Sequence, residues 1–173
     1  MRLQAFARRK DKLMSVNVVT RFVVISLVSI ATPSLASEVQ LSCPAGTVQK
    51  GKTTKSESVY CVKTASTDIK PNLHGPYVDF WPNGQKQSEG QYLNGFRSGR
   101  WTYWDANGVK TGETEFVAGD YHGERVQYFA NGKPKMIEQY RKGIRNGTVQ
   151  EMNEDGKVVR QAQFSDGHEV ASR

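Results

Sequence analysis

The sequence predicts an all-β protein: an elongated single antiparallel sheet of tandem 24-residue β-hairpin repeats, preceded by an N-terminal disulfide-tied hairpin. Two series of glycines and one series of Asn-Gly or Asp-Gly pairs recur every 24 residues without insertion. Two columns of aromatic or apolar residues have the same period. Five columns with one period indicate a repeated structural unit. The columns are Gly75, Gly99, Gly123 and Gly147; Asn83-Gly84, Asn107-Gly108, Asn131-Gly132 and Asp155-Gly156; Gly95, Gly119, Gly143 and Gly167; Phe80, Trp104, Tyr128 and Met152; and Tyr92, Phe116, Tyr140 and Phe164.

Each repeat is expected to contain two strands joined at the Asn-Gly pair, followed by a second glycine-bearing turn that leads into the next hairpin. Asn-Gly between β-prone runs favours a type I′ turn, because that turn needs positive φ at both central residues. Four hairpins over residues 74–173 predict about eight strands, with a short polar tail after Asp166. At about 4.8 Å per strand, one repeat advances the sheet by roughly 10 Å.

Residues 1–36 have the three-part layout of a secretory signal peptide. Six basic residues and one acid lie within residues 1–21, an uncharged apolar run extends over residues 22–31, and Ser34-Leu35-Ala36 has small residues at the cleavage positions. The apolar run of about ten residues is shorter than the roughly 20 that span a bilayer. We expect cleavage after Ala36 and a periplasmic or secreted protein, with the start at either Met1 or Met14.

Removal of this leader changes the charge argument. The whole chain has 24 basic and 17 acidic residues and a net charge of +7; without the leader's six bases and one acid, 18 and 16 remain, a net charge of +2. The remaining Lys and Arg are interleaved with Asp and Glu. Because nucleic-acid binding proteins present a basic stripe, no nucleic-acid partner is expected.

The two cysteines, Cys43 and Cys61, predict a single disulfide, because they are even in number, enclose 17 residues and lie in an exported chain. A loop of this size contributes about 3 kcal/mol in the chain-entropy model. Two alternatives are weaker. A metal site would need more Cys or His nearby, and a lipid-modified Cys43 would need to follow the apolar run directly, after a different triplet.

Residues 37–73 indicate a separate piece before the repeats. Ala45–Gln49 and Ser58–Val62 are expected to be the strands of the tied hairpin, and Lys63–Leu73 a polar linker. Such a short segment buries little core, so the disulfide is a useful tie. The hairpin is expected to cover the edge of the first repeat, which would otherwise pair with another chain.

The run Gly99-Arg100-Trp101-Thr102-Tyr103-Trp104-Asp105-Ala106-Asn107-Gly108, followed by Phe116, Gly119 and Gly123, resembles the bacterial variant of the MORN repeat, a Gly- and aromatic-rich β-hairpin unit. The resemblance covers about 100 residues, and the fourth copy departs most, with Val149 and Met152 at positions where the family prefers aromatics. The resemblance implies a non-catalytic module that associates with proteins or membranes. It also suggests antitoxin-like or immunity-like partner binding, although a cytoplasmic antitoxin does not fit a signal peptide.

Histidines and acids are expected to serve the fold. His74 and His122 share a column two repeats apart, roughly 19 Å, which is too far for one zinc ion. Glu113 and Glu115 point to the same side of one strand and are expected to form a solvated surface rather than an acid/base pair. No enzyme activity, catalytic residue, metal ligand or cofactor is predicted.

The aromatic residues are more numerous than one covered face requires. In strand alternation the Phe80 column shares a face with Val78, and the Tyr92 column is expected to join it. The other face carries a candidate binding strip. If exposed, the strip marks a binding surface; if paired across strands, it stiffens the sheet. The strip consists of Tyr77, Trp81, Trp101, Tyr103 and Phe129.

The leading hypothesis is a non-enzymatic, exported interaction module that presents this strip to an envelope or extracellular protein. The alternative is association with membrane lipid or cell-wall glycan, where Trp and Tyr would contact the bilayer interface or stack on sugar rings.

Overall fold

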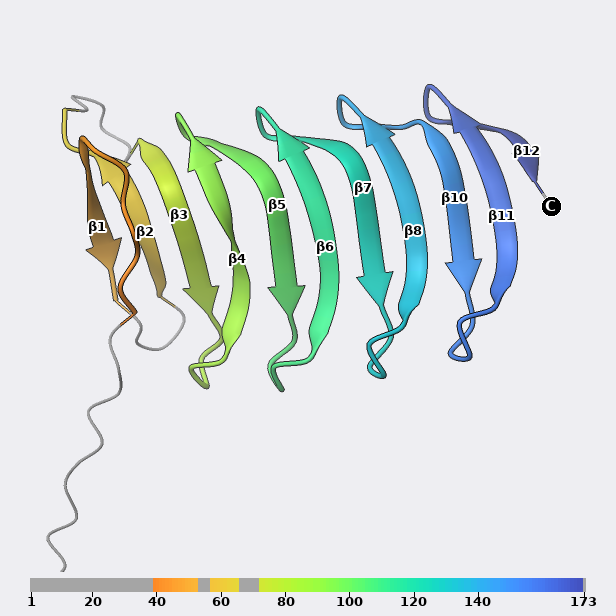
Figure 1. Cartoon of the computed structure of the whole chain (residues 1–173), viewed down its shortest axis with the longest axis horizontal. Helices are drawn as coiled ribbons and strands as arrows, with labels where there is room; N and C mark the ends of the chain where they lie inside the picture. Colours follow the sequence, from red (N-terminus) through yellow and green to blue (C-terminus); the bar gives the residue numbers. More distant parts are fainter. Residues whose placement is uncertain (1–38, 53–56, 66–71, 173) are drawn as a thin grey trace, which may run out of the picture. The chain divides into compact units, whose positions relative to one another are not determined.

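The computed structural model describes residues 39–52, 57–65 and 72–172, which form one open sheet of twelve strands (Figure 1). The predicted signal peptide, residues 1–36, and residues 66–71 of the predicted linker lie outside the described residues. The described residues include no helix that could span a membrane. The strands are β1 (Thr47–Gly51), β2 (Ser58–Lys63), β3 (Leu73–Phe80), β4 (Lys86–Leu93), β5 (Phe96–Trp104), β6 (Lys110–Val117), β7 (Asp120–Tyr128), β8 (Pro134–Arg141), β9 (Ile144–Arg145), β10 (Gly147–Met152), β11 (Val158–Ser165) and β12 (His168–Ser172).

Strands that follow one another in the chain lie side by side in the sheet (Figure 1), and every pair is antiparallel. The two-residue strand β9 pairs with β8, and β10, which follows it in the chain, also pairs with β8. Short connections favour the pairing of each strand with the strands that precede and follow it in the chain. The predicted fold class, a single antiparallel sheet of tandem hairpins, is confirmed.

The Asn-Gly turns close the hairpins, but they are not the predicted type I′ turns. In the first repeat Gly84 has a φ of 83°, whereas Asn83 is absent from the described residues with positive φ. The amide of Gly84 donates to the carbonyl of Trp81 and the amide of Trp81 donates to the carbonyl of Gln85, at 2.8 Å each. This pattern is a type I turn followed by a glycine in the left-handed region.

The asparagine side chains stabilise these turns by hydrogen bonds. The Oδ1 atom of Asn83 accepts a hydrogen bond from the amide of Gln85 at 3.0 Å, and its Nδ2 atom donates to the carbonyl of Ala106 in the next Asn-Gly turn. Asn131 likewise donates to the carbonyl of Glu154, at 3.1 Å, one repeat further on. The asparagine column therefore bonds each of these turns to the next repeat.

Positive φ at two successive residues occurs at the second turn of each repeat. Asn94 and Gly95 have φ values of 52° and 85°, and Ala118 has 51° at the equivalent position. These are the dihedrals of a type I′ turn. The amide of Gly95 donates to the carbonyl of Leu73 at 2.8 Å, and the same bond recurs at the next three second turns. These turns therefore also connect neighbouring repeats.

A β-bulge in every repeat decides which side chains share a face. In the first hairpin the register shifts between Asp79 and Phe80, and the same shift recurs in the other three. One extra residue turns the rest of the strand over. The Tyr92 column therefore lies on the face of Trp101, with ring centroids 5.2 Å apart. The prediction that it joins the Phe80 column is wrong, because simple alternation does not count the bulged residue.

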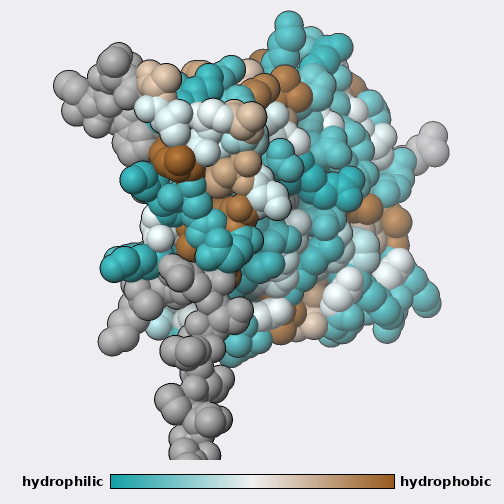
Figure 2. All heavy atoms as spheres, turned by 60° about the vertical axis from the view of Figure 1, so that its left-hand side comes forward, coloured by the Kyte–Doolittle hydropathy of each residue, from teal (hydrophilic) through white to brown (hydrophobic). Residues whose placement is uncertain are grey.

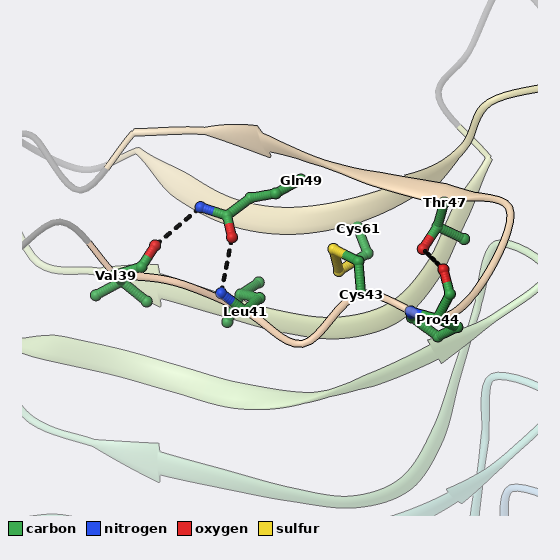
Figure 3. The surroundings of a disulfide bond; sticks show 7 residues. All are labelled: Val39, Leu41, Cys43, Pro44, Thr47, Gln49 and Cys61. Carbon is green, nitrogen blue, oxygen red and sulfur yellow. Dashed lines mark hydrogen bonds between the residues drawn. A yellow bond between two sulfur atoms is a disulfide. The ribbon is translucent and has the colours of Figure 1, made fainter.

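The N-terminal segment is tied to the sheet by the predicted disulfide, which is confirmed. The Cα atoms of Cys43 and Cys61 are 5.6 Å apart (Figure 3). The side chain of Gln49 holds the same segment, because it accepts a hydrogen bond from the amide of Leu41 at 2.7 Å and donates to the carbonyl of Val39 at 2.8 Å. This arrangement places Val39 and Leu41 against a small core of Val59, Val78 and Phe80.

The tied hairpin begins later than the sequence indicates. The amide and hydroxyl of Thr47 both donate to the carbonyl of Pro44, at 3.1 and 2.6 Å, so that Ala45 and Gly46 form a turn instead of the start of a strand. Strand β2 then pairs with β3, as expected for a hairpin that covers the edge of the first repeat.

The other end of the sheet also differs from the expectation. The residues after Asp166 are not a polar tail, because β12 pairs with β11. His168 stands 24 residues after Ile144, in the column of residues at which β5, β7 and β9 start. The repeat pattern therefore continues beyond the fourth hairpin, and β12 corresponds to the first strand of a fifth.

Candidate binding site on the aromatic face

The face that carries Tyr77 and Trp101 holds a continuous row of aromatic side chains, and we call it the ladder face. Consecutive rings in the row have centroids 5.1 to 6.2 Å apart, mostly edge to face. Such pairs contribute roughly 0.5 to 1.5 kcal/mol each beyond their buried area. The row forms because aromatic columns of successive repeats alternate along the sheet. It consists of Tyr60, Tyr77, Tyr92, Trp101, Phe116, Tyr121 and Tyr140.

Trp101 lies in the middle of this row and is fully buried, with 0% of its surface exposed. A Cβ atom on Gly90 would lie 2.4 Å from the indole ring, so the ring occupies the space that the glycine leaves. Its Nε1 atom donates to the carbonyl of Gln91 at 3.2 Å. The guanidinium of Arg97 covers the ring, with Cζ 4.4 Å from the centroid. A single-layer sheet thus buries a tryptophan without a second layer.

A hollow of about 410 Å³ opens on the ladder face over β5, β6 and β7, and we call it the ladder-face hollow. Its depth results from two small residues of β6: Gly112, which pairs with Tyr103, and Thr114, which pairs with Arg125. Larger side chains around them form the walls. The wall residues are Arg97, Tyr103, Tyr121, Arg125 and Gln127.

Two groups in this hollow have shifted pKa values. Burial raises the pKa of Tyr103, so its hydroxyl stays protonated and can donate a hydrogen bond. Burial lowers the pKa of Arg97, but hydrogen bonding with Tyr92 and the nearby tyrosines raises it more, and the net pKa is above its usual value. The hollow therefore combines a fixed cation with neutral hydroxyl donors.

The third repeat places a buried ion cluster beside the hollow, and we call it the Glu138 triad. Glu138 has 0% of its surface exposed and accepts hydrogen bonds from Arg125 and, at 2.5 Å, from Arg145. The hydroxyl of Tyr140 lies 3.3 Å from the same carboxylate. Two cations surround one anion, which leaves the triad with one net positive charge next to the hollow.

The five residues of the predicted strip do not form one surface. Tyr77 and Trp101 belong to the aromatic row, and Trp101 is fully buried, so only Tyr103 lines the hollow. Trp81 and Phe129 begin Asn-Gly turns; the Nε1 atom of Trp81 donates to the carbonyl of Trp104 at 3.0 Å. For Trp101 the structure favours the alternative stated from the sequence, in which cross-strand aromatics stiffen the sheet.

Strand alternation in the sequence places Arg125 and Gln127 on the face of the strip, but the strip did not include them, and it did not include Arg97 or Tyr121. Arg97 and Tyr121 follow a second turn by two residues, and Arg125 occupies the column of Trp101 one repeat later. A column-by-column comparison would have shown that this position changes from aromatic to arginine. It would not have shown that these side chains line one hollow, since that depends on the bulges.

The other chemistry considered from the sequence lies elsewhere. His74 accepts a hydrogen bond from the amide of Asn94 at 3.3 Å. Glu113 bonds with Lys110 at 2.7 Å, and Glu115 lies 3.4 Å from Arg100. Within residues 39–52, 57–65 and 72–172, no three His, Cys, Asp or Glu side chains converge as metal ligands would. In the view of Figure 2, hydrophobic residues form small separate groups on a mainly hydrophilic surface.

Comparison with known proteins identifies the repeat type. The family model described as the MORN repeat variant matches residues 73–94 and 121–142, and the chain carries this repeat at both positions. The first match contains β3 and β4, and the second contains β8 and most of β7. The resemblance seen in the sequence is confirmed for the repeat type.

One solved structure with a similar chain is the Glycosylation Associate Protein (Gap123) complex from Streptococcus agalactiae, with 18% identity and a TM-score of 0.38. The match covers 67% of this chain and 20% of that chain. No curated protein matches the sequence.

Proposed function

We propose that this chain, with its MORN repeat variants, is a non-enzymatic module that binds a protein partner through the ladder-face hollow. The observation that carries the proposal is the hollow itself, where rigid tyrosines and arginine side chains surround an open volume of about 410 Å³. Tyrosine and arginine are enriched where proteins recognise other proteins, because both offer large contact areas together with hydrogen-bond donors. Repeat arrays are frequent carriers of such extended binding surfaces.

The absence of enzyme activity is part of the proposal and rests on how the described acids are used. Glu113, Glu115 and Glu138 each lie against a lysine or arginine. A general acid or base needs a pKa near the working pH, whereas the effect of burial on Glu113 is outweighed by hydrogen bonds from Lys110 and Tyr128, which hold its pKa below the usual value. These acids therefore suit a structural role.

The proposed place of action is the cell envelope or the exterior. This part rests on the basic leader, the apolar run that follows it and the small residues before Ser37. The Cys43–Cys61 disulfide suits an oxidising compartment. Fractionation of cells that express the full chain, followed by N-terminal sequencing, should give an exported form that starts at Ser37. An unprocessed chain in the cytoplasm would contradict this part alone.

Partner binding is tested by crosslinking in cells followed by affinity capture of the tagged chain. We expect a defined protein to be captured by the wild type and lost with the double variant Tyr121→Ala, Gln127→Ala, which removes two walls of the hollow. The matched control is Glu124→Ala, Gln139→Ala, a hydrogen-bonded pair on the opposite face, of which Glu124 is exposed and Gln139 partly buried. Equal capture by both variants would contradict the role of the hollow. Sedimentation with liposomes or wall material, without a protein partner, would contradict the proposed function.

A further inference from the structure

We propose that the ladder-face hollow recognises a carboxylate side chain of an acidic protein segment, which Arg97 and Arg125 hold between them. This inference rests on the proposed function and names the chemistry of the partner. Both arginines line the hollow from adjacent hairpins, one from β5 and one from β7. The lining residues include no aspartate or glutamate, so the charge of the hollow is not neutralised from within.

Arg97 is the first element of the site. Its guanidinium stacks on Trp101 at 4.4 Å and lies 5.5 Å from the ring of Phe116. No ion pair of the described residues includes Arg97. An arginine stacked on an aromatic ring keeps its planar edge available for bidentate hydrogen bonds to a carboxylate. The side chain is thus oriented in advance for an anion.

Arg125 is the second element. One of its nitrogens, Nη1, bonds Glu138, whose other oxygen accepts from Arg145 at 2.5 Å. Glu138 therefore neutralises only one of the two arginines. With Arg97, the residues around the hollow carry a net charge of about +2. The triad also holds Arg125 in place, which lowers the entropy lost when a ligand binds.

Neutral donors complete the site. Tyr103, Tyr121, Thr114 and Gln127 line the same volume, and each has a side chain that can donate a hydrogen bond. A carboxylate has two oxygens and about four lone-pair positions, more than two arginines need to occupy. These groups can satisfy the rest, and the tyrosine rings can contact the aliphatic part of a glutamate or aspartate.

The charge of the hollow favours a protein segment over a membrane or a nucleic acid. Polyanionic surfaces are bound by clusters of about 4 to 8 basic residues, and phosphate backbones by a row of neutralising contacts. The hollow offers two arginines, and the chain without its leader has a net charge of +2.

The test measures binding of a fluorescent peptide in which Ser and Glu alternate, against the same peptide with Gln at each Glu, by fluorescence polarisation at low salt. We expect the wild-type protein to bind the Glu peptide at least about tenfold more tightly than the Gln peptide, and added NaCl to weaken this binding. Arg97→Gln should weaken Glu-peptide binding about tenfold or more. The matched control is Arg100→Gln, which removes the same charge from the opposite face of β5 and should leave affinity within about twofold.

Arg97→Lys separates the loss of a contact from a loss of fold, because lysine keeps the charge but forms no bidentate bond. We expect several-fold weaker binding with an unchanged far-ultraviolet spectrum. Equal affinity for both peptides, wild-type affinity of Arg97→Gln, or preferential binding of inorganic phosphate or anionic vesicles would each overturn the inference. If the crosslinked partner is still captured through the hollow in those cases, the proposed function stands. If no partner is captured, the proposed function fails independently.

Discussion

The second and third repeats place different chemistry at the same columns of the ladder face. In the second repeat these columns hold Trp101, Thr114 and Tyr121; 24 residues later they hold Arg125, Glu138 and Arg145. The backbone is the same in both, with a bulge at the same position and the same pairing order. One repeat is built on an aromatic interior and the next on an ion triad.

The two interiors are stabilised by different terms. Trp101 removes a large apolar surface from water, and each Å² contributes roughly 25 cal/mol. Glu138 is equally buried, but its burial is unfavourable unless its charge is paired, and two arginines with one hydroxyl supply that pairing. The repeat frame therefore accepts either solution, provided that each column finds its cross-strand partner. The junction between the two is where the ladder-face hollow opens.

The largest expected effect is the loss of the aromatic interior. Trp101→Ala should lower the free energy of unfolding by about 4 kcal/mol, because it removes a fully buried indole and leaves a cavity over Gly90. Urea unfolding followed by circular dichroism measures the change. The control is Trp104→Ala, a partly exposed tryptophan on the opposite face of the same strand, which should cost less than half as much. Equal losses would show that burial does not distinguish the two residues.

Removal of the buried anion is expected to have the next largest effect. Glu138→Ala should cost about 3 kcal/mol, because Arg125 and Arg145 lose the carboxylate that pairs them. The control is Glu115→Ala, whose partner Arg100 lies 3.4 Å away with 65% of its side chain exposed. That change should cost less than about 1 kcal/mol. A stable Glu138→Ala variant would mean that the triad is no more than a surface contact.

The partly exposed ion pair of Glu113 with Lys110 should make the stability of the fold depend on pH. Burial raises the pKa of Glu113, but hydrogen bonds from Lys110 and Tyr128 lower it more, and the net pKa is below its usual value of 4.5. The ionised group therefore stabilises the fold at neutral pH, and this stabilisation is lost as the pH falls through the lowered pKa. Urea unfolding should show that the free energy of unfolding of the wild type falls more below about pH 4.5 than that of Glu113→Gln. The difference should be less than about 1 kcal/mol. Parallel pH profiles would refute this.

The smallest expected effect concerns the turn that joins the two repeats. Ala118 has a φ of 51°, where glycine or asparagine is favoured. Ala118→Gly should raise the free energy of unfolding by about 0.5 to 1 kcal/mol, because the strain of a Cβ atom in this conformation is removed. In contrast, Gly119→Ala, at a φ of 90°, should be destabilising. Thermal unfolding of both variants measures the opposite signs; a loss of stability with Ala118→Gly would exclude strain at this turn.

The candidate site was less predictable than the fold. The strip inferred from the sequence contained Tyr103, which lines the hollow, and Trp101, which lies outside its lining and packs beneath Arg97. It left out Arg125, because the strip was limited to aromatic residues of that face, and it did not consider Arg97 and Tyr121 at the start of β5 and β7. Trp81 and Phe129 were included because their parity fits the strip, but they begin turns.

The sequence by itself determined the period, the number of hairpins, the positions of both kinds of turn and the Cys43–Cys61 pairing. These depend on glycine, asparagine and cysteine at fixed short spacings, so the local chain carries the information. The tertiary structure decided which aromatics share a face, that the Asn-Gly turns bond neighbouring repeats, and that Glu138 is buried between two arginines. Those features depend on strand register and on side chains 7 to 23 residues away, where one bulged residue reverses the outcome.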